Sequence, residues 1–105
     1  MEQPNISYIQ SMSGGDVAFE KKIIAIIKEE FPLERAEYTN NFKSKKFGLA
    51  AQNVHKLKHK ISILGLKKSY DIAVAFEYNL LDGNSELNED FESILDTISH
   101  YLNQL

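Results

Sequence analysis

His55, Lys58 and His59 lie within one short stretch near the middle of the chain. An imidazole nitrogen that carries no proton is a nucleophile near neutral pH, and it can attack phosphorus without a general base. Residues three apart lie on the same face of a helix, so the ammonium group of Lys58 can reach an anion attached to His55. These residue types and this spacing predict phosphoryl transfer, in which a protein contributes mainly positioning and charge neutralisation.

The charge of the chain is unevenly distributed around His55. The formal net charge is −3, from 12 Lys and Arg against 15 Asp and Glu, but residues 43–68 contain eight lysines and no acid. Positive charge near an imidazole disfavours its protonated form, so we expect a neutral His55 near pH 7. The same lysines would stabilise an anion on the ring. A run of like charges is also typical of an ordinary solvated face, or of a surface that meets an acidic partner.

The composition excludes several other kinds of chemistry. The chain has 105 residues, 43% of them hydrophobic and 26% charged, which suits one globular domain over residues 1–105. It has no cysteine, which rules out disulfides, thiolate metal sites and cysteine nucleophiles. We find no Gly-rich phosphate loop and expect neither a kinase nor another enzyme. Residues 1–10 have neither the basic nor the apolar region of a signal peptide, and the apolar runs are far shorter than the ~20 residues that span a bilayer, so we expect a cytoplasmic protein.

The elements that must position His55 are helices, because apolar residues recur with a helical period almost throughout. At ~100° per residue, His55 points roughly 140° away from the apolar seam of its own helix. That seam is spaced 3, 4, 3, 4, 3 and consists of Phe47, Ala50, Val54, Leu57, Ile61 and Leu64. The predicted helices cover residues 6–12, 16–44, 48–64, 67–81 and 86–104. Short connections favour antiparallel neighbours, so we expect an all-α, antiparallel up-down four-helix bundle with a short extra N-terminal helix.

Particular residues mark the predicted helix boundaries. Asn5 is a candidate N-cap of the first helix, Gly14 and Gly15 end it, and Ser85 is a candidate N-cap of the last helix. Pro32 predicts a kink near Phe31 or two helices in succession.

Two further apolar stripes should face the core. On the second helix the expected core residues are Ile24, Ile27, Phe31, Tyr38 and Phe42, widened by Phe19, Ile23 and Ile26. On the fourth helix they are Leu66, Tyr70, Ala73, Val74 and Leu81.

The segment His55–Lys58, followed by Gly65–Leu66, resembles the signature of histidine-containing phosphotransfer (HPt) domains. That signature is His-x-aliphatic-Lys-Gly, with a further Gly at the tenth position after the His. The resemblance extends over most of the chain. Residues Gly14–Asp16 are similar to the opening turn of the family, Phe31–Pro32 to its kinked long helix, and Phe47 to the aromatic residue before the phosphorylated helix. The family fold is an antiparallel four-helix bundle.

The resemblance implies that His55 is the phosphoryl acceptor and Lys58 its supporting lysine. Gln52, His59 and Ser62 lie around the same helix face and are candidates to contact the phosphoryl group or the docking partner. The implied partners are receiver domains of response regulators and a hybrid sensor histidine kinase, and the chain is expected to act as a monomer. It needs no cofactor of its own, because magnesium belongs to the receiver partner.

Two residues depart from the family pattern: His59 occupies the place where the family prefers Gly, and Lys60 follows where a small residue is common. Helical side chains lean toward the N-terminus, so His59 should lean over the turn that carries His55. It would then crowd the partner, donate a hydrogen bond to the phosphoryl group, or compete as an acceptor.

Two other functions fit parts of the same segment. His55 and His59 have the i, i+4 spacing of metal ligands, but no third ligand lies near them in sequence and the lysines oppose a cation, so no metal is expected. The lysines of residues 43–68 also fit a nucleic-acid-binding or adaptor helix, although the segment contains no Arg and the final segment is acidic.

Overall fold

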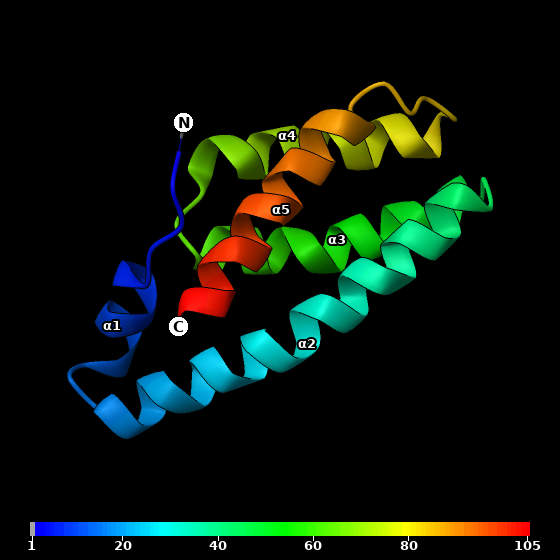
Figure 1. The fold of residues 1–105 in the computed structure, drawn as a ribbon. Helices are drawn as coiled ribbons and strands as arrows, with labels where there is room; N and C mark the ends of the chain where they lie inside the picture. Colours follow the sequence, from blue (N-terminus) through cyan, green and yellow to red (C-terminus); the bar gives the residue numbers. More distant parts are fainter. Residues whose placement is uncertain (1) are drawn as a thin grey trace.

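The computed structural model describes residues 2–105, and this part of the chain consists of five α-helices with no strand (Figure 1). The helices are α1 (Ser7–Ser13), α2 (Val17–Lys43), α3 (Phe47–Ile63), α4 (Lys67–Leu81) and α5 (Asn88–Gln104). Each boundary lies within two residues of the one expected from the sequence. The all-α class is therefore confirmed. Within residues 2–105, no helix combines the length and the hydrophobicity needed to cross a lipid bilayer.

The helix ends on either side of the first turn follow from local hydrogen bonds. The N-cap position of α1 is Ile6 and not Asn5 as expected, but the Asn5 side-chain oxygen accepts from the Ser7 amide at 3.1 Å just before the helix. Gly14 ends α1 in the left-handed conformation, with φ at 61°. The Asp16 carboxylate then accepts from the Phe19 amide at 3.1 Å and caps the start of α2.

The start of α5 differs from its prediction. Ser85 does not cap it, because the Asn84 side chain accepts from the Glu86 amide within the turn and the helix begins only at Asn88. The Tyr38 hydroxyl of α2 donates to the Asn88 side chain and so holds the first residue of α5 against α2. Burial, together with the nearby Glu92 carboxylate, raises the pKa of Tyr38, so the hydroxyl keeps its proton at neutral pH.

Pro32 does not divide α2, which is one helix over its whole length (Figure 1). The alternative of two successive helices is therefore wrong. The proline removes one backbone donor, but the neighbouring Phe31 is fully packed in the core and holds the helix there.

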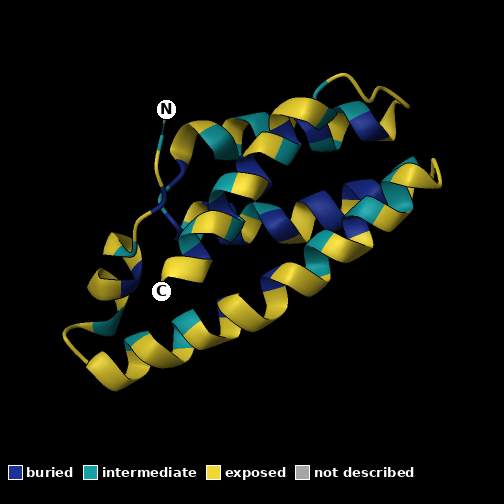
Figure 2. Ribbon diagram, in the orientation of Figure 1, coloured by how far each residue is buried: buried dark blue, intermediate teal, exposed yellow. Residues whose placement is uncertain are grey.

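The core lies where α2, α3, α4 and α5 meet, and Figure 2 shows its buried residues on the inner faces of these helices. Helix α3 packs against α2 and α4, α4 packs against α5, and α5 returns to α2. The predicted seam of α3 is buried from Ala50 to Leu64, with Phe47 half-buried at its start. The rings of Tyr38, Phe76 and Phe91 pack with centroids 5.2–6.1 Å apart and join α2, α4 and α5.

Three residues expected in the core are exposed instead. Phe19 and Ile26 are 41% and 44% exposed, because only α1 lies along the N-terminal part of α2 and covers one edge of it (Figure 1). On α4, Leu81 is 62% exposed. Phe76 and Leu80 are buried there, since they continue the helical stripe that Ala73 begins.

The N-terminal segment ties the α3–α4 turn in place. The Asn5 amide donates to the Leu64 carbonyl at 2.9 Å. The Glu2 carboxylate accepts from the amides of Lys68 and Ser69 at 2.9 and 3.0 Å and so caps α4. Burial raises the pKa of Glu2, but these hydrogen bonds outweigh it and the pKa lies below its usual value. The segment therefore fixes the start of the helix that runs beside His55.

We predict that Gly65→Ala destabilises the fold by about 2 kcal/mol or more in urea unfolding, because two costs add. Gly65 has a φ of +79°, and a Cβ there would lie 2.6 Å from the Asn5 side-chain amide. Gly83→Ala is the matched control, since its φ is +78° but the space around it is open. Equal losses for the two variants would contradict a role for the Asn5 contact.

Candidate functional site

His55 projects from the exposed side of α3, and its side chain is 54% exposed. Its Nδ1 lies 3.2 and 3.3 Å from the two carboxylate oxygens of Glu77 on α4. An ionised carboxylate only accepts hydrogen bonds, so Nδ1 is the nitrogen that carries the proton. In the neutral ring the unprotonated nitrogen is then Nε2, which is free to act as a nucleophile.

Lys58 contacts the same carboxylate. Its Nζ lies 3.0 Å from Oε1 of Glu77, and its side chain is only 13% exposed. The ammonium group also lies 5.9 Å from the ring centroid of Tyr70, where a cation is attracted by the aromatic face. Glu77 thus joins His55 and Lys58, and the charged group in contact with the imidazole is a carboxylate. The prediction that only positively charged side chains surround His55 is therefore wrong.

The remaining predicted site residues lie at different distances from this cluster. The His59 ring is perpendicular to that of His55, with centroids 5.2 Å apart, and it is exposed. Gln52 lines a shallow cleft of about 330 Å³ beside His55, and Ala51, Lys56, Glu77 and Leu81 line it as well. Ser62 lines another cleft of about 520 Å³ together with Tyr8 and Tyr70. The structure therefore groups His55, Lys58, His59 and Gln52, whereas Ser62 belongs to a neighbouring cleft.

The lysine-rich segment is not a continuous basic surface. Lys60 is 9% exposed, and its Nζ lies 3.1 Å from Glu30 and 3.0 Å from Glu34 on α2. Lys58 is likewise neutralised by Glu77. Two of the eight lysines therefore join helices rather than face solvent.

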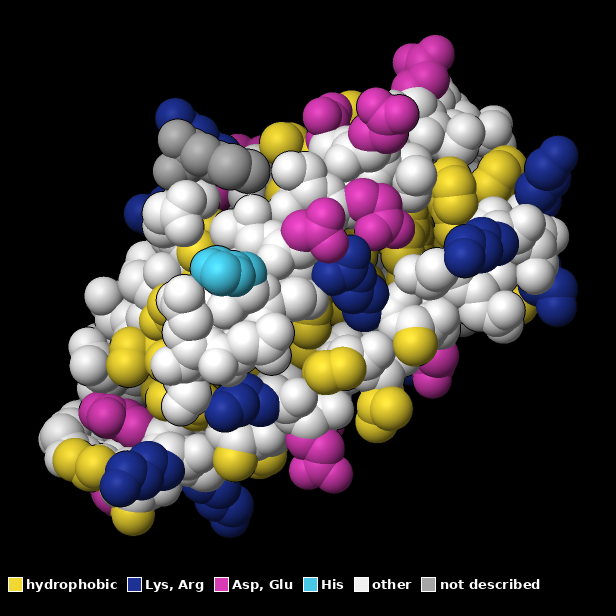
Figure 3. Space-filling model, viewed as in Figure 1, with side chains coloured by type: hydrophobic (Ala, Val, Ile, Leu, Met, Phe, Trp, Pro, Cys, Tyr) yellow, Lys and Arg dark blue, Asp and Glu magenta, His cyan; other side chains and the backbone are white. Residues whose placement is uncertain are grey.

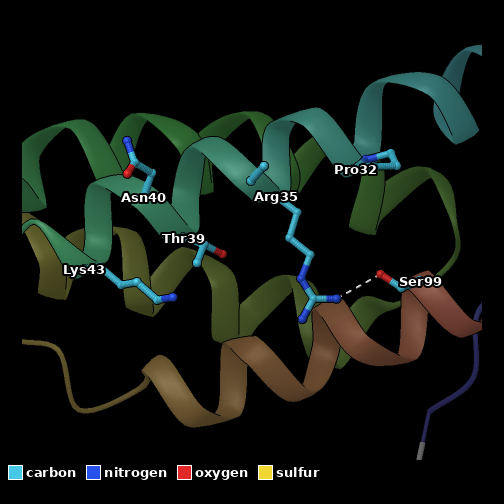
Figure 4. A pocket seen from close by; sticks show the side chains of 7 residues that line it. Pro32, Arg35, Thr39, Asn40, Lys43 and Ser99 are labelled. Atoms are coloured by element: carbon cyan, nitrogen blue, oxygen red, sulfur yellow. Dashed lines mark hydrogen bonds between the residues drawn. The ribbon is translucent and has the colours of Figure 1, made fainter.

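A third open cleft, of about 470 Å³, lies between α2 and α5 (Figure 4). Arg35 crosses it and donates to the Ser99 hydroxyl at 2.9 Å. The guanidinium group also lies 3.2 Å from Glu92 and 2.6 Å from Asp96. Because three hydrogen bonds from its guanidinium group go to α5, we interpret Arg35 as a link between the two helices. Within residues 2–105, no three His, Asp or Glu side chains are grouped to hold a metal ion.

Glu77 is the site residue that sequence reasoning missed. It lies on a different helix from His55, and the helical period of α3 carries no information about it. The position of the turn does carry such information. His55 lies eleven residues before Leu66 and Glu77 eleven residues after it, so a hairpin folded at that turn brings the two side chains together.

Comparison of the chain with models of protein families, with curated proteins and with solved structures found no significant match.

The contact with Glu77 predicts a single His55 tautomer. In long-range ¹H–¹⁵N NMR spectra at pH about 8, we expect His55 to carry its proton on Nδ1 in the unmodified protein. Glu77→Ala should convert this to a mixture of both tautomers, whereas Asp71→Ala, an exposed acid on the same helix, should change nothing. The same tautomer in all three proteins would show that Glu77 does not orient the ring.

Proposed function

We propose that this protein is an HPt phosphocarrier whose His55 accepts a phosphoryl group from the aspartyl phosphate of a receiver domain and passes it to another receiver. The observation that carries the proposal is the exposed imidazole of His55, whose Nδ1 contacts Glu77, so that Nε2 is the nitrogen available for attack in the neutral ring. The resemblance of His55–Lys58 and Gly65 to the HPt signature supports the same reaction.

The proposed step needs no general base. The lone pair of Nε2 attacks phosphorus, the bond from phosphorus to the aspartyl oxygen breaks, and its electron pair leaves with the receiver carboxylate. The ring keeps its proton on Nδ1 and becomes a phosphorylated imidazolium. The Glu77 carboxylate, 3.2 Å from Nδ1, balances the positive charge that forms on the ring. The reverse step returns the phosphoryl group to a second receiver. The resemblance assigns magnesium to the receiver and not to this chain.

Lys58 has a second role in this proposal. Its ammonium group is held 3.0 Å from Glu77, one helical turn after His55. A phosphoryl group on Nε2 offers it new oxygen acceptors, and charge-assisted hydrogen bonds to phosphate are among the stronger ones in proteins. Lys58 would then share its donors between Glu77 and the phosphoryl group.

We also propose how the helices are arranged and which proteins bind beside His55. Helices α2 to α5 would form the antiparallel up-down bundle of the family, with α1 as an additional helix, and the contacts that link α2, α3, α4 and α5 in a ring support this. The implied partners are receiver domains and a hybrid sensor kinase. The cleft beside His55 has apolar walls at Ala51 and Leu81, which suit a docking protein surface.

The alternative is a nucleic-acid-binding or adaptor helix that uses the lysines of residues 43–68. The ion pairs of Lys58 and Lys60 weaken its support, because they remove two cations from the surface that would face phosphates.

The assignment of His55 is tested by phosphorylation in vitro. The protein is incubated with potassium phosphoramidate, a small-molecule phosphoryl donor, and with receiver domains loaded by acetyl phosphate, and the modified residue is mapped by mass spectrometry. We expect one phosphoryl group, which His55→Gln removes and His100→Gln retains. A label that survives in His55→Gln but is lost in His59→Gln would overturn the assignment, and so would the absence of label from the unmodified protein.

A second prediction concerns His59, whose ring packs edge-to-face with His55. Replacing His59 with Gly should speed transfer from the receiver several-fold, because it opens the approach to His55. His59→Ala separates this effect from the flexibility that Gly adds to a helix, which costs about 1 kcal/mol. A slower or unchanged rate in both variants would reject crowding, and a slower rate would favour a hydrogen bond from His59 to the phosphoryl group.

A further inference from the structure

An apolar stripe runs along the outer face of α2. Phe19, Ile26 and Leu33 are seven residues apart, and at ~100° per residue they lie within about 40° of one another on the helix surface. Leu33 is 65% exposed, and the other two are also exposed. Figure 2 shows exposed residues along the outer side of α2, and Figure 3 shows hydrophobic side chains along the edge of the molecule that this helix forms.

The stripe is separate from the core and from the site at His55. The core face of α2 carries Ile27, Phe31 and Tyr38, which point to a different side of the helix. His55 faces Glu77 on α4, whereas the stripe lies on α2. Three large apolar side chains at heptad spacing on one exposed helix are typical of a surface that packs against another helix.

The charges beside the stripe indicate which helix fits it. Lys22 and Glu29 lie next to the stripe, on the side away from the α3 contacts of Glu30 and Glu34. Within residues 2–105, neither Lys22 nor Glu29 takes part in an ion pair.

A second copy of α2, packed antiparallel about a twofold axis at Ile26, complements this surface. Residues at equal distances before and after Ile26 then oppose each other, so Phe19 faces Leu33 of the other copy. Lys22 is four residues before Ile26 and Glu29 three after it. In an antiparallel pair the same flank meets on both helices, so Lys22 of each copy lies opposite Glu29 of the other.

We propose that this face is a homodimer interface in which two α2 helices pack antiparallel through Phe19, Ile26 and Leu33, flanked by two Lys22–Glu29 ion pairs. The proposal does not depend on the proposed phosphotransfer, and it departs from the monomer expected from the sequence. Both His55 side chains stay outside the interface, so each copy can still meet its own partner.

The first test measures molar mass by sedimentation velocity from about 10 µM to about 1 mM, the range in which small interfaces associate. We expect a reversible dimer for the unmodified protein. Ile26→Glu should weaken it at least about a hundredfold, because it places two carboxylates at the twofold axis. Tyr78→Glu, which changes a 67% exposed apolar residue on α4, should leave it intact. A monomer throughout the range, or equal effects of both variants, would contradict the proposal.

The second test uses the charges to check the register. Lys22→Glu alone and Glu29→Lys alone should each weaken the dimer about fivefold or more, since two attractive pairs become repulsive. The double variant should regain the affinity of the unmodified protein. An equimolar mixture of the two single variants should form heterodimers, because every pair is then complementary. Additive weakening in the double variant would overturn the antiparallel arrangement, and circular dichroism of each variant checks that the fold is retained.

Discussion

Burial of one side of α3 is the constraint on which the rest of this structure depends. Its seam from Ala50 to Leu64 is almost completely removed from solvent by contact with α2 and α4. Removing apolar surface of this extent from water is the main favourable term in folding, and it fixes the rotation of the helix. Once the rotation is fixed, His55 has to face outward beside α4. The exposure of the imidazole is thus a consequence of core packing rather than of any contact made by His55.

Glu77 converts this exposed histidine into an oriented group. A single carboxylate accepts from His55 Nδ1 and from Lys58 Nζ, so one residue of α4 fixes the ring and holds the lysine one turn away. Glu77 lies on α4, and the place where it meets α3 depends on the turn at Gly65. The hydrogen bonds that Glu2 and Asn5 make around this turn hold it in place. The N-terminal segment therefore contributes to the site although it does not touch His55.

Much of the fold could be predicted from the sequence, because helical period and helix-ending residues are local signals. They located all five helices and the α3 seam, and they placed His55 on the exposed side. The exposure of Phe19 and Ile26 could not be predicted in this way, since it depends on how far the other helices extend along α2. The sequence singles out Gly65 only as part of the HPt-like signature. Its close approach to Asn5 comes from a segment sixty residues earlier in the chain. Glu77 was missed for the same reason, as the contact joins two helices.

In the proposed reaction, Nε2 of His55 carries the phosphoryl group while Glu77 holds the proton on Nδ1. NMR of the ¹⁵N-histidine-labelled protein after reaction with phosphoramidate distinguishes the two ring nitrogens. We expect a ³¹P–¹⁵N coupling at Nε2 of His55, with Nδ1 of the same ring still protonated. A coupling at Nδ1 of His55, or at either nitrogen of His59, would contradict it.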